Sequence, residues 1–328
     1  MRYKFCHQLK NNIFFANNEI IHCCAGSESI APKFRSNYFG EIFSGEELIK
    51  EKVEAQNRAK SGMLPFSSCK NCFSYEENDW DDDCLIKDIS ISHWTACNCN
   101  CFYCYSAKDK EYFNSRKPYD LLPVLENIKS VISPDCKVRF IGGDVAMLKE
   151  FDDLIKFFSD LGVKDFYVPT SGIKFLNVLE NLLSKGLARA IISLDAGDRE
   201  TYKKIKQVDC FEKVVENMQK YVAAAKVGGA VFEAKYIIIP NVNDTFEQIQ
   251  KWLDLCVSMG IKNVGMDFET NYLVNCPDKI PDNAVKLEEF VEKIALENGM
   301  KYCRFTYLSQ LVHGLENGLY RFAGENEV

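Results

Sequence analysis

The sequence predicts an α/β fold with a parallel sheet, and three observations favour this class. Apolar, β-branched or aromatic runs alternate with segments of helical periodicity over the last two thirds of the 328 residues. Six such strand–helix repeats follow one another, which is typical of parallel sheets. Several helical segments end in glycine, which suits a left-handed helix cap. Spacing alone leaves open whether the sheet closes partly as a barrel or stays open and doubly wound.

Each repeat has its own pattern. The first strand alternates apolar and polar residues, and the others are short β-branched or aromatic runs. The predicted strands cover 86–94, 137–142, 165–169, 188–194, 230–239 and 263–268. The helices that follow them cover 120–132, 149–161, 175–185, 211–226, 246–259 and 284–297.

The first eighty residues differ from this rhythm. They contain Gly, Asn and Ser clusters, scattered cysteines and one predicted helix, Gly45–Lys60, whose acidic residues come early, as the helix dipole prefers. The acidic stretch 76–83 is typical of a solvated linker. We therefore expect two domains, a small cysteine-rich module at 1–80 and the strand–helix repeats at 85–328, ending in a helix and a tail.

Composition excludes several classes of protein. The net charge is −7 and no long basic run occurs, which argues against a nucleic-acid partner. No apolar stretch is long enough to span a bilayer, and the first residues lack the apolar region of a signal peptide. We therefore expect a cytoplasmic protein without a membrane partner. Ten of its 15 cysteines lie at or before Cys104, and in the cytosol such thiols indicate metal or redox chemistry more often than disulfides.

The loop after the first predicted strand carries the strongest motif. Cys97, Cys101 and Cys104 have the spacing C-x-x-x-C-x-x-C, and Tyr103 precedes the last thiol. Three thiolates in a tight loop suit an iron–sulfur cube that keeps one iron without a protein ligand. Cys99 falls outside the spacing and is interpreted as a bystander. A zinc ribbon built from Cys69-x-x-Cys72 and Cys101-x-x-Cys104 is the alternative, although the gap between the pairs is longer than a usual ribbon loop.

Further motifs follow the later predicted strands, where parallel α/β folds bind ligands. They are Gly142-Gly143-Asp144, Thr170-Ser171-Gly172, Ser193-Leu194-Asp195 and Asn241-Val242-Asn243-Asp244. Taken singly each has an ordinary explanation, because a Gly-Gly-Asp is commonly a turn and Ser or Asp commonly begins a helix. Their order along the chain carries more weight than any one of them.

Together with the cysteine loop, these motifs resemble those of the radical S-adenosylmethionine (SAM) superfamily over about residues 86–270. The resemblance implies a partial (β/α)6 TIM-like barrel. It also implies a 4Fe–4S cluster on Cys97, Cys101 and Cys104 that binds SAM, and whose reduction splits SAM to a 5′-deoxyadenosyl radical. Asp144 stands where the family has glutamate and would accept hydrogen bonds from the methionine ammonium of SAM. The remaining SAM contacts implied are Tyr103 near the adenine, the backbone at Gly142 and Gly143, and Thr170, Ser171, Ser193 and Asp195 for ribose or methionine groups.

The amino-terminal segment resembles the SPASM or twitch modules that accompany many radical SAM enzymes, although those modules normally follow the barrel. The resemblance implies a second, fully ligated 4Fe–4S cluster on Cys6, Cys69, Cys72 and either Cys23 or Cys24, with Cys23 favoured. Cys84 would then be a spare structural thiol. A cap stapled by zinc on the same residues is the alternative.

The combination predicts an enzyme that abstracts a hydrogen atom from a substrate, and an auxiliary cluster favours oxidation, that is dehydrogenation, of a small molecule. A flavodoxin- or ferredoxin-type donor would supply the electron. A short-peptide maturase and a redox-neutral epimerase remain as alternatives. For an epimerase, Cys276 and Cys303 are weak candidates for the hydrogen donor, although buried structural thiols are the simpler interpretation. A non-catalytic zinc- or iron–sulfur-binding protein is the third class.

Overall fold

A computed structural model describes residues 2–16, 20–21, 44–66, 69–70, 72, 75–104, 119–269 and 283–304. These residues divide into two compact units. The first unit draws on Met1–Ala96, Glu111–Gly143 and Leu148–Tyr167, and the second on Cys97–Lys110, Asp144–Met147 and Val168–Val328. Within the described ranges, no helix is long and apolar enough to cross a membrane.

The first unit is built on parallel strands with one antiparallel edge. Its strand order is β3 (Ile20–Ile21), β2 (Asn12–Phe15), β5 (Ile86–Ile91), β6 (Ile132–Phe140) and β7 (Asp165–Thr170), where only β3 runs antiparallel to its neighbour. Only the first half of β7, up to Tyr167, belongs to this unit, and the rest of the strand belongs to the second. A separate two-stranded sheet pairs β1 (Arg2–Phe5) with β4 (Glu76–Asp79). The helices of this unit are α1 (His7–Asn11), α2 (Gly45–Lys60), α5 (Leu122–Ile128) with the 3-10 turn η2 (Lys129–Val131), and α6 (Phe151–Asp160).

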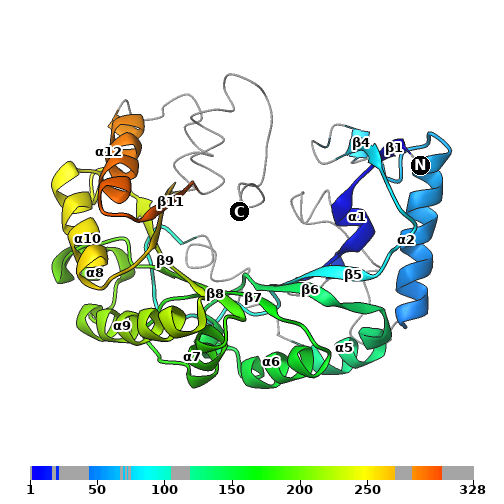
Figure 1. Ribbon diagram of the computed structural model, residues 1–328, viewed down its shortest axis with the longest axis horizontal. Helices are drawn as coiled ribbons and strands as arrows, with labels where there is room; N and C mark the ends of the chain where they lie inside the picture. Colours follow the sequence, from blue (N-terminus) through cyan, green and yellow to red (C-terminus); the bar gives the residue numbers. More distant parts are fainter. Residues whose placement is uncertain are drawn as a thin grey trace. The chain divides into compact units, whose positions relative to one another are not determined.

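The second unit repeats the strand–helix rhythm. Its parallel strands lie in the order β8 (Ala188–Ser193), β9 (Val231–Ile238), β10 (Asn263–Phe268) and β11 (Lys301–Arg304). The helices are α7 (Asn177–Ser184), α8 (Arg199–Lys206), α9 (Phe211–Gly228), α10 (Phe246–Ser258) and α12 (Asn283–Glu297), preceded by the short 3-10 turn η3 (Val145–Met147). Figure 1 shows α9, α10 and α12 along the outer face of these strands.

The two faces of the second unit's strands differ in chemistry because successive side chains of a strand point to opposite sides. Phe232 and Tyr236 of β9 pack on the helices, against Tyr221 of α9 and Trp252 of α10, at ring-centroid distances of 6.3 and 5.0 Å. The other face of β9 carries Glu233 and Lys235. One face of this sheet is therefore an apolar core and the other is polar.

The α/β class with a parallel sheet is confirmed, and all six predicted strands and seven predicted helices exist with small shifts of their ends. The largest shift is in β6, which begins at Ile132 rather than at 137. Residues of the amino-terminal segment also add strands, because β2 pairs in register with β5 from Asn12 opposite Asp88 to Phe15 opposite Ile91. The segment before residue 80 thus extends the parallel sheet of the first unit.

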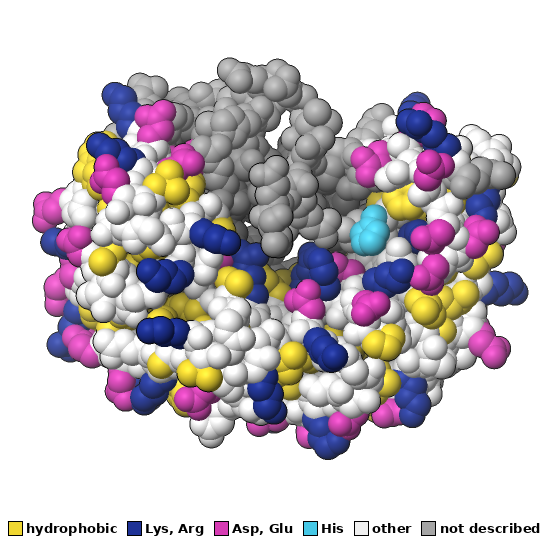
Figure 2. Space-filling model, in the orientation of Figure 1, with side chains coloured by type: hydrophobic (Ala, Val, Ile, Leu, Met, Phe, Trp, Pro, Cys, Tyr) yellow, Lys and Arg dark blue, Asp and Glu magenta, His cyan; other side chains and the backbone are white. Residues whose placement is uncertain are grey.

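Charged side chains of both signs are interspersed over the face in Figure 2, on helices and loops alike. Several exposed ion pairs of the chain join side chains one helical turn apart, such as Lys156 with Asp160 and Lys220 with Glu216. Pairs of this kind contribute little to stability individually.

Candidate iron–sulfur and SAM site

The cysteine loop of the second unit is anchored on the end of a helix. The backbone N–H of Asn100 donates to the carbonyl of Lys206 at 3.0 Å, and that of Phe102 donates to the carbonyl of Ile205 at 3.2 Å. These carbonyls belong to the last turn of α8, where acceptors lack partners within the helix. Within the loop, the N–H of Cys104 donates to the carbonyl of Cys101 at 3.0 Å. The loop therefore has a defined backbone shape before any ligand binds.

The thiols of Cys97, Cys99 and Cys101 lie in contact. Hydrogen bonds from the Cys99 side chain lower the pKa of Cys97, and that of Cys101 to about 6, against the opposing effect of burial. The charge of Lys206 also lowers the pKa of Cys101. The pKa of Cys99 is raised by the same hydrogen bonds and by burial. A lowered pKa favours the thiolate, which is the form of cysteine that binds metals.

A buried trio of side chains lies behind the loop. Asp195, at the end of β8, is fully buried and pairs with the ammonium of Lys206. The Tyr103 hydroxyl donates to the same carboxylate oxygen at 2.7 Å, and lies 3.2 Å from the Lys206 nitrogen. The second oxygen of Asp195 accepts from the backbone N–H of Ile237 at 2.8 Å. The Asp195 carboxylate thus holds protein groups from three segments of the chain.

Asp195 has an unusual backbone as well. Its φ is +59°, a left-handed conformation that non-glycine residues seldom adopt, although Asp tolerates it better than most. Asn243, from the loop after β9, donates to its carbonyl at 2.9 Å and thereby holds this conformation. The amide oxygen of Asn243 accepts from the N–H of Ile239 at 2.7 Å. This amide therefore joins the end of β8 to the end of β9.

Asp144, Thr170 and Ser171 come together at the ends of their strands. The Asp144 carboxylate accepts from the Thr170 hydroxyl at 3.0 Å and from the Ser171 N–H at 2.8 Å. It also accepts from the N–H of Ala146 at 2.8 Å. We call Asp144, Thr170 and Ser171 the cradle. The Ser171 hydroxyl donates to the side-chain oxygen of Asn98 at 2.8 Å, and this hydrogen bond connects the cradle to the cysteine loop. Asp144 is only 3% exposed, so the main effect of its carboxylate is to hold Thr170 and Ser171 in place.

Gly142 and Gly143 belong to the first unit and allow a close backbone crossing. A Cβ on Gly142 would lie 2.6 Å from the carbonyl oxygen of Trp94, and one on Gly143 would lie 2.2 Å from that of Ala96. The N–H of Gly143 donates to the Trp94 carbonyl at 3.0 Å. Here the close approach that these glycines permit is to the segment that leads into the cysteine loop.

Ser193 belongs to a row of paired residues that crosses the strands of the second unit. It pairs with Lys235 of β9, Lys235 pairs with Gly265 of β10, and Gly265 pairs with Cys303 of β11. The Lys235 ammonium donates to the Asp267 carboxylate at 2.8 Å. Cys303 is half-buried, and its pKa is raised by burial and by the charge of Glu233.

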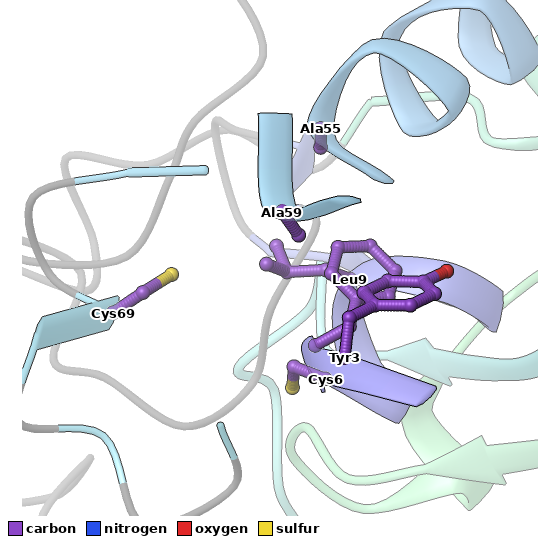
Figure 3. Close-up of a cluster of buried hydrophobic side chains, with 7 residues drawn as sticks. Tyr3, Cys6, Leu9, Ala55, Ala59 and Cys69 are labelled. Carbon is purple, nitrogen blue, oxygen red and sulfur yellow. The ribbon is translucent and has the colours of Figure 1, made fainter. Parts of the chain in front are cut away.

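Three thiols predicted for the second cluster lie in the first unit. Cys6 and Cys69 belong to one buried cluster with Tyr3 and Leu9, and they come from separate segments of the chain (Figure 3). The N–H of Cys72 donates to the carbonyl of Cys69 at 3.3 Å. Tyr75 packs against the same buried cluster, and burial raises its pKa.

Other predicted thiols fall elsewhere. Cys84 is buried and donates to the Gln56 side-chain oxygen at 3.5 Å. Cys23, its alternative Cys24, and Cys276 lie outside the described residues. Among all residues that the structure describes, no three His, Cys, Asp or Glu side chains are placed to hold a single metal ion.

Lys206, Asn98 and Asn243 were not singled out from the sequence. Lys206 ends the run Lys203-Lys204-Ile205-Lys206, which is typical of a solvated helix face. The only sign of a different role is its place four residues after Tyr202 and one after Ile205, both buried. Asn98 lies between the predicted ligands, and Asn243 lies in a motif whose individual side chains were given no role.

Comparison with known proteins identifies the family of this chain. The family model described as Radical SAM superfamily matches residues 91–256, which is 166 of the 328 residues. A curated relative from Saccharolobus islandicus, named probable GTP 3′,8-cyclase, is 25% identical over 233 residues, covering 70% of this chain and 72% of the relative. One of the same name from Methanocaldococcus jannaschii is 30% identical over 166 residues, covering 49% and 54%.

Among solved structures, Streptococcus suis SuiB bound to S-adenosylmethionine matches with a TM-score of 0.52 at 15% identity. The match covers 88% of this chain and 60% of the SuiB chain, so this protein spans less than two thirds of that structure. At this identity the likeness concerns the fold, and it is consistent with a partial TIM-like barrel. Since the family model covers more than half of the chain, the protein belongs to the radical SAM superfamily and is a radical SAM enzyme.

Proposed function

We propose that this enzyme abstracts a hydrogen atom from a small polar molecule and oxidises it. The observation that carries the proposal is the cysteine loop of the second unit, which is fixed on α8 and tied through Asn98 to the cradle of Asp144, Thr170 and Ser171. A loop ordered in this way supports a site in which three thiols and a set of polar strand ends act together. Family membership implies both a 4Fe–4S cluster and SAM.

The residues fit those groups. Cys97, Cys101 and Cys104 would hold the cluster, since they have the required spacing and lie partly accessible at a loop. When bound, cluster and SAM together supply reductive cleavage of SAM and hence a radical that removes hydrogen from substrate. The pKa of Cys99 is raised by hydrogen bonding with its two thiol neighbours and by burial, which disfavours the thiolate form that binds metals, so we assign it no ligand role.

The chain's own polar groups would orient SAM. Asp144 holds Thr170 and Ser171 in position, and by the family resemblance its carboxylate would accept hydrogen bonds from the SAM ammonium. Ser193 and the backbone that follows Gly142 and Gly143 would contact the ribose and methionine groups. Tyr103 would border the adenine with its ring while its hydroxyl stays on Asp195. Asp195 itself is committed to protein donors, so we assign it support of the site rather than direct contact.

The polar face of the second unit supports a polar small-molecule substrate. Lys235 and Asp267 form an ion pair there, and both side chains keep some exposure, 17% and 8%. The pair stands beside Ser193 and next to Gly265, which has no side chain. A substrate with a carboxylate or an ammonium group would find a partner of opposite charge in this pair. Cys303 shares the row and is retained as a candidate hydrogen donor for a redox-neutral outcome.

The choice of oxidation rests on the amino-terminal thiols. Cys6 and Cys69 share one buried cluster, and Cys72 follows within the same turn. With a fourth ligand from Cys23 or Cys24, these residues would saturate a second cluster, which leaves it the role of electron acceptor. Four protein ligands close such a cluster to direct substrate binding.

Cyclisation of a purine nucleotide is the second candidate. Its support is the similarity to relatives named probable GTP 3′,8-cyclase, which extends over 70% of this chain. Such a substrate is polar and anionic, so Lys235 would also serve it. The two candidates differ in the substrate consumed and in whether the product is more oxidised than the substrate.

Anaerobic reconstitution with iron, sulfide, SAM and a reductant tests the core of the proposal. The expected product is 5′-deoxyadenosine, formed slowly without substrate. A variant with alanine at Cys97, Cys101 and Cys104 should form none, while Cys136→Ala, a buried thiol of β6, is the matched control. Adding GTP then separates the candidates, because a cyclase would consume GTP and accelerate SAM cleavage. Absence of 5′-deoxyadenosine from a fully reconstituted wild-type protein would refute the proposal.

A further inference from the structure

We propose that Lys206 is a positioning residue for the cysteine loop and that its fixed charge, opposed by Asp195, sets the reduction potential of the cluster held there. The inference rests on the proposed cluster at Cys97, Cys101 and Cys104. It concerns a buried ion pair that the family motifs do not explain, and it assigns a task to a lysine that ends a short helix.

The first step is the location of the ion pair. Lys206 is 4% exposed and Asp195 is fully buried. The ammonium contacts the carboxylate and the Tyr103 hydroxyl, and Tyr103 is the residue directly before Cys104. Taking two charges out of water is costly, and replacing such a pair by apolar residues often stabilises a protein. Stability alone therefore does not account for this pair.

The second step is the connection to the cluster loop. The carbonyl of Lys206 accepts from the N–H of Asn100, and the carbonyl of Ile205 accepts from the N–H of Phe102. These two donors flank Cys101 in the sequence. Both the backbone and the side chain of Lys206 thus hold the loop, one at Cys101 and the other at the residue before Cys104.

The third step is electrostatic. The Lys206 ammonium and the Asp195 carboxylate are fixed charges that both contact the hydroxyl of Tyr103, the residue before Cys104, and both are buried. Charges act strongly in a buried environment because little water screens them. Net charge near an iron–sulfur cluster is one of the factors that set its potential. A cation stabilises the more negative, reduced state, so it raises the potential, whereas an anion lowers it.

These steps give the two partners opposite effects. Lys206→Met should make the potential of the SAM-binding cluster more negative, and Asp195→Asn should make it less negative. Lys206→Arg keeps the charge and should restore a potential near that of the wild type. A purely mechanical tether would instead give shifts of the same sign in both variants, or none, because either change removes the same contact.

The experiment is a redox titration of the reconstituted holoenzyme without SAM, followed by the EPR signal of the reduced cluster. To keep one cluster in view, all variants carry Cys69→Ala and Cys72→Ala. Lys204→Met, an exposed neighbour on α8, is the matched control and should leave the potential unchanged. Shifts of opposite sign for Lys206→Met and Asp195→Asn support the inference, and shifts of one sign or no shifts overturn it.

If one of the single variants fails to bind the cluster, the double variant provides a second comparison with the single variant that still binds it. The double variant with Lys206→Met and Asp195→Asn buries no unpaired charge, and because it removes two opposing charges its potential should lie between those of the two single variants, less negative than in Lys206→Met and more negative than in Asp195→Asn. A potential outside that interval would also overturn the inference. A parent protein that binds no cluster would instead refute the proposed function, so the two failures are distinguishable.

Discussion

At the residue scale, Asp144 shows how one carboxylate can serve both the fold and a ligand. Its side chain is buried and accepts from two backbone N–H groups and one hydroxyl. Removing it leaves those donors without a partner, which costs about 1–3 kcal/mol for a buried group. The same oxygens are the ones we assign to the SAM ammonium, so stability and SAM affinity should change together.

Asp144→Ala is therefore expected to lower the melting temperature and to weaken SAM binding about ten- to a hundredfold, with both clusters retained. Thermal melting and a SAM titration of the reconstituted enzyme measure the two effects. Asp153→Ala, at an exposed position in the first turn of α6, is the control and should change SAM affinity little. An unchanged SAM affinity in Asp144→Ala would show that the Gly142-Gly143-Asp144 motif is only a turn and does not bind SAM.

Cys99 provides a second test at this scale. Its thiol bridges Cys97 and Cys101, but its own pKa is raised, so it is a poor ligand beside two better ones. Cys99→Ala should keep the iron content and nearly all SAM cleavage, measured as 5′-deoxyadenosine. Loss of the cluster in Cys99→Ala alone, with Cys97→Ala tolerated, would exchange the roles of these two residues.

Residues were predictable where a spacing carries chemistry. The thiols at 97, 101 and 104 stand out because a cluster needs that separation along the chain. Lys206 did not stand out, since a lysine in a basic helical run is usually solvated and its burial depends on tertiary packing against Asp195. The role of Asp195 was hidden for the same reason, because its partners Tyr103 and Ile237 are distant in sequence.

At the element scale, α8 positions the cysteine loop and is itself held at both ends. Asp198 caps its first turn, with its carboxylate accepting from the N–H of Thr201 at 2.9 Å. Arg199 pairs with Asp209, just beyond the helix, through two hydrogen bonds of 2.7 and 2.9 Å. The hydrogen bond from Arg199 is the main cause that lowers the pKa of Asp209 to about 2.

This pair predicts a pH dependence. The folded-state pKa of Asp209 lies below the unfolded value of about 3.9, so its stabilisation is complete above that value and is lost as pH falls towards 2. Asp209→Asn should therefore reduce the melting temperature at pH 6 more than at pH 3. High salt should also shrink the difference, because the pair is exposed. A difference that stays constant between pH 6 and pH 3 would contradict this assignment.

Elements were predictable where burial dominates their composition. The central strands are short apolar runs because their apolar face packs under helices, as Phe232 does on Tyr221. By contrast, α8 is short and mostly polar, and its sequence RETYKKIK has too few turns for a clear period. The strands β1 and β4 were missed too. β4 is wholly exposed and acidic, so only its pairing with β1 makes it a strand.

At the scale of the whole molecule, the order of segments along the chain did not predict which strands pair in the sheet. The segment before residue 80 contributes β2 and β3 to the sheet of the first unit, because the apolar side chains of Ile13 and Phe15 match those of Ile89 and Ile91 in register. Pairing across such a distance in the chain leaves no local signal. The parallel sheet itself was predictable, since six strand–helix repeats favour few other arrangements.

The amino-terminal thiols give the last prediction at this scale. Anaerobically purified protein should bind about eight irons with matching sulfide, as two cubes of four. Replacing Cys69 and Cys72 by alanine should lower this to about four and spare uncoupled cleavage of SAM, since that needs only the cluster at 97–104. If the reaction is an oxidation, turnover of the true substrate should stop, because the electron then has no acceptor.

Stability must be controlled in this variant, because structural metal sites contribute folding energy and Cys69 also packs in the buried cluster around Tyr3 and Cys6. Cys84→Ala, another buried thiol of the same unit, serves as the matched control and should keep about eight irons. Its melting temperature shows how much of any loss of stability comes from packing rather than from metal.

Two outcomes would change the proposal. About four irons in the wild type would mean that the amino-terminal site holds zinc or no metal. Full substrate turnover by a folded Cys69→Ala, Cys72→Ala variant would replace oxidation by a redox-neutral reaction.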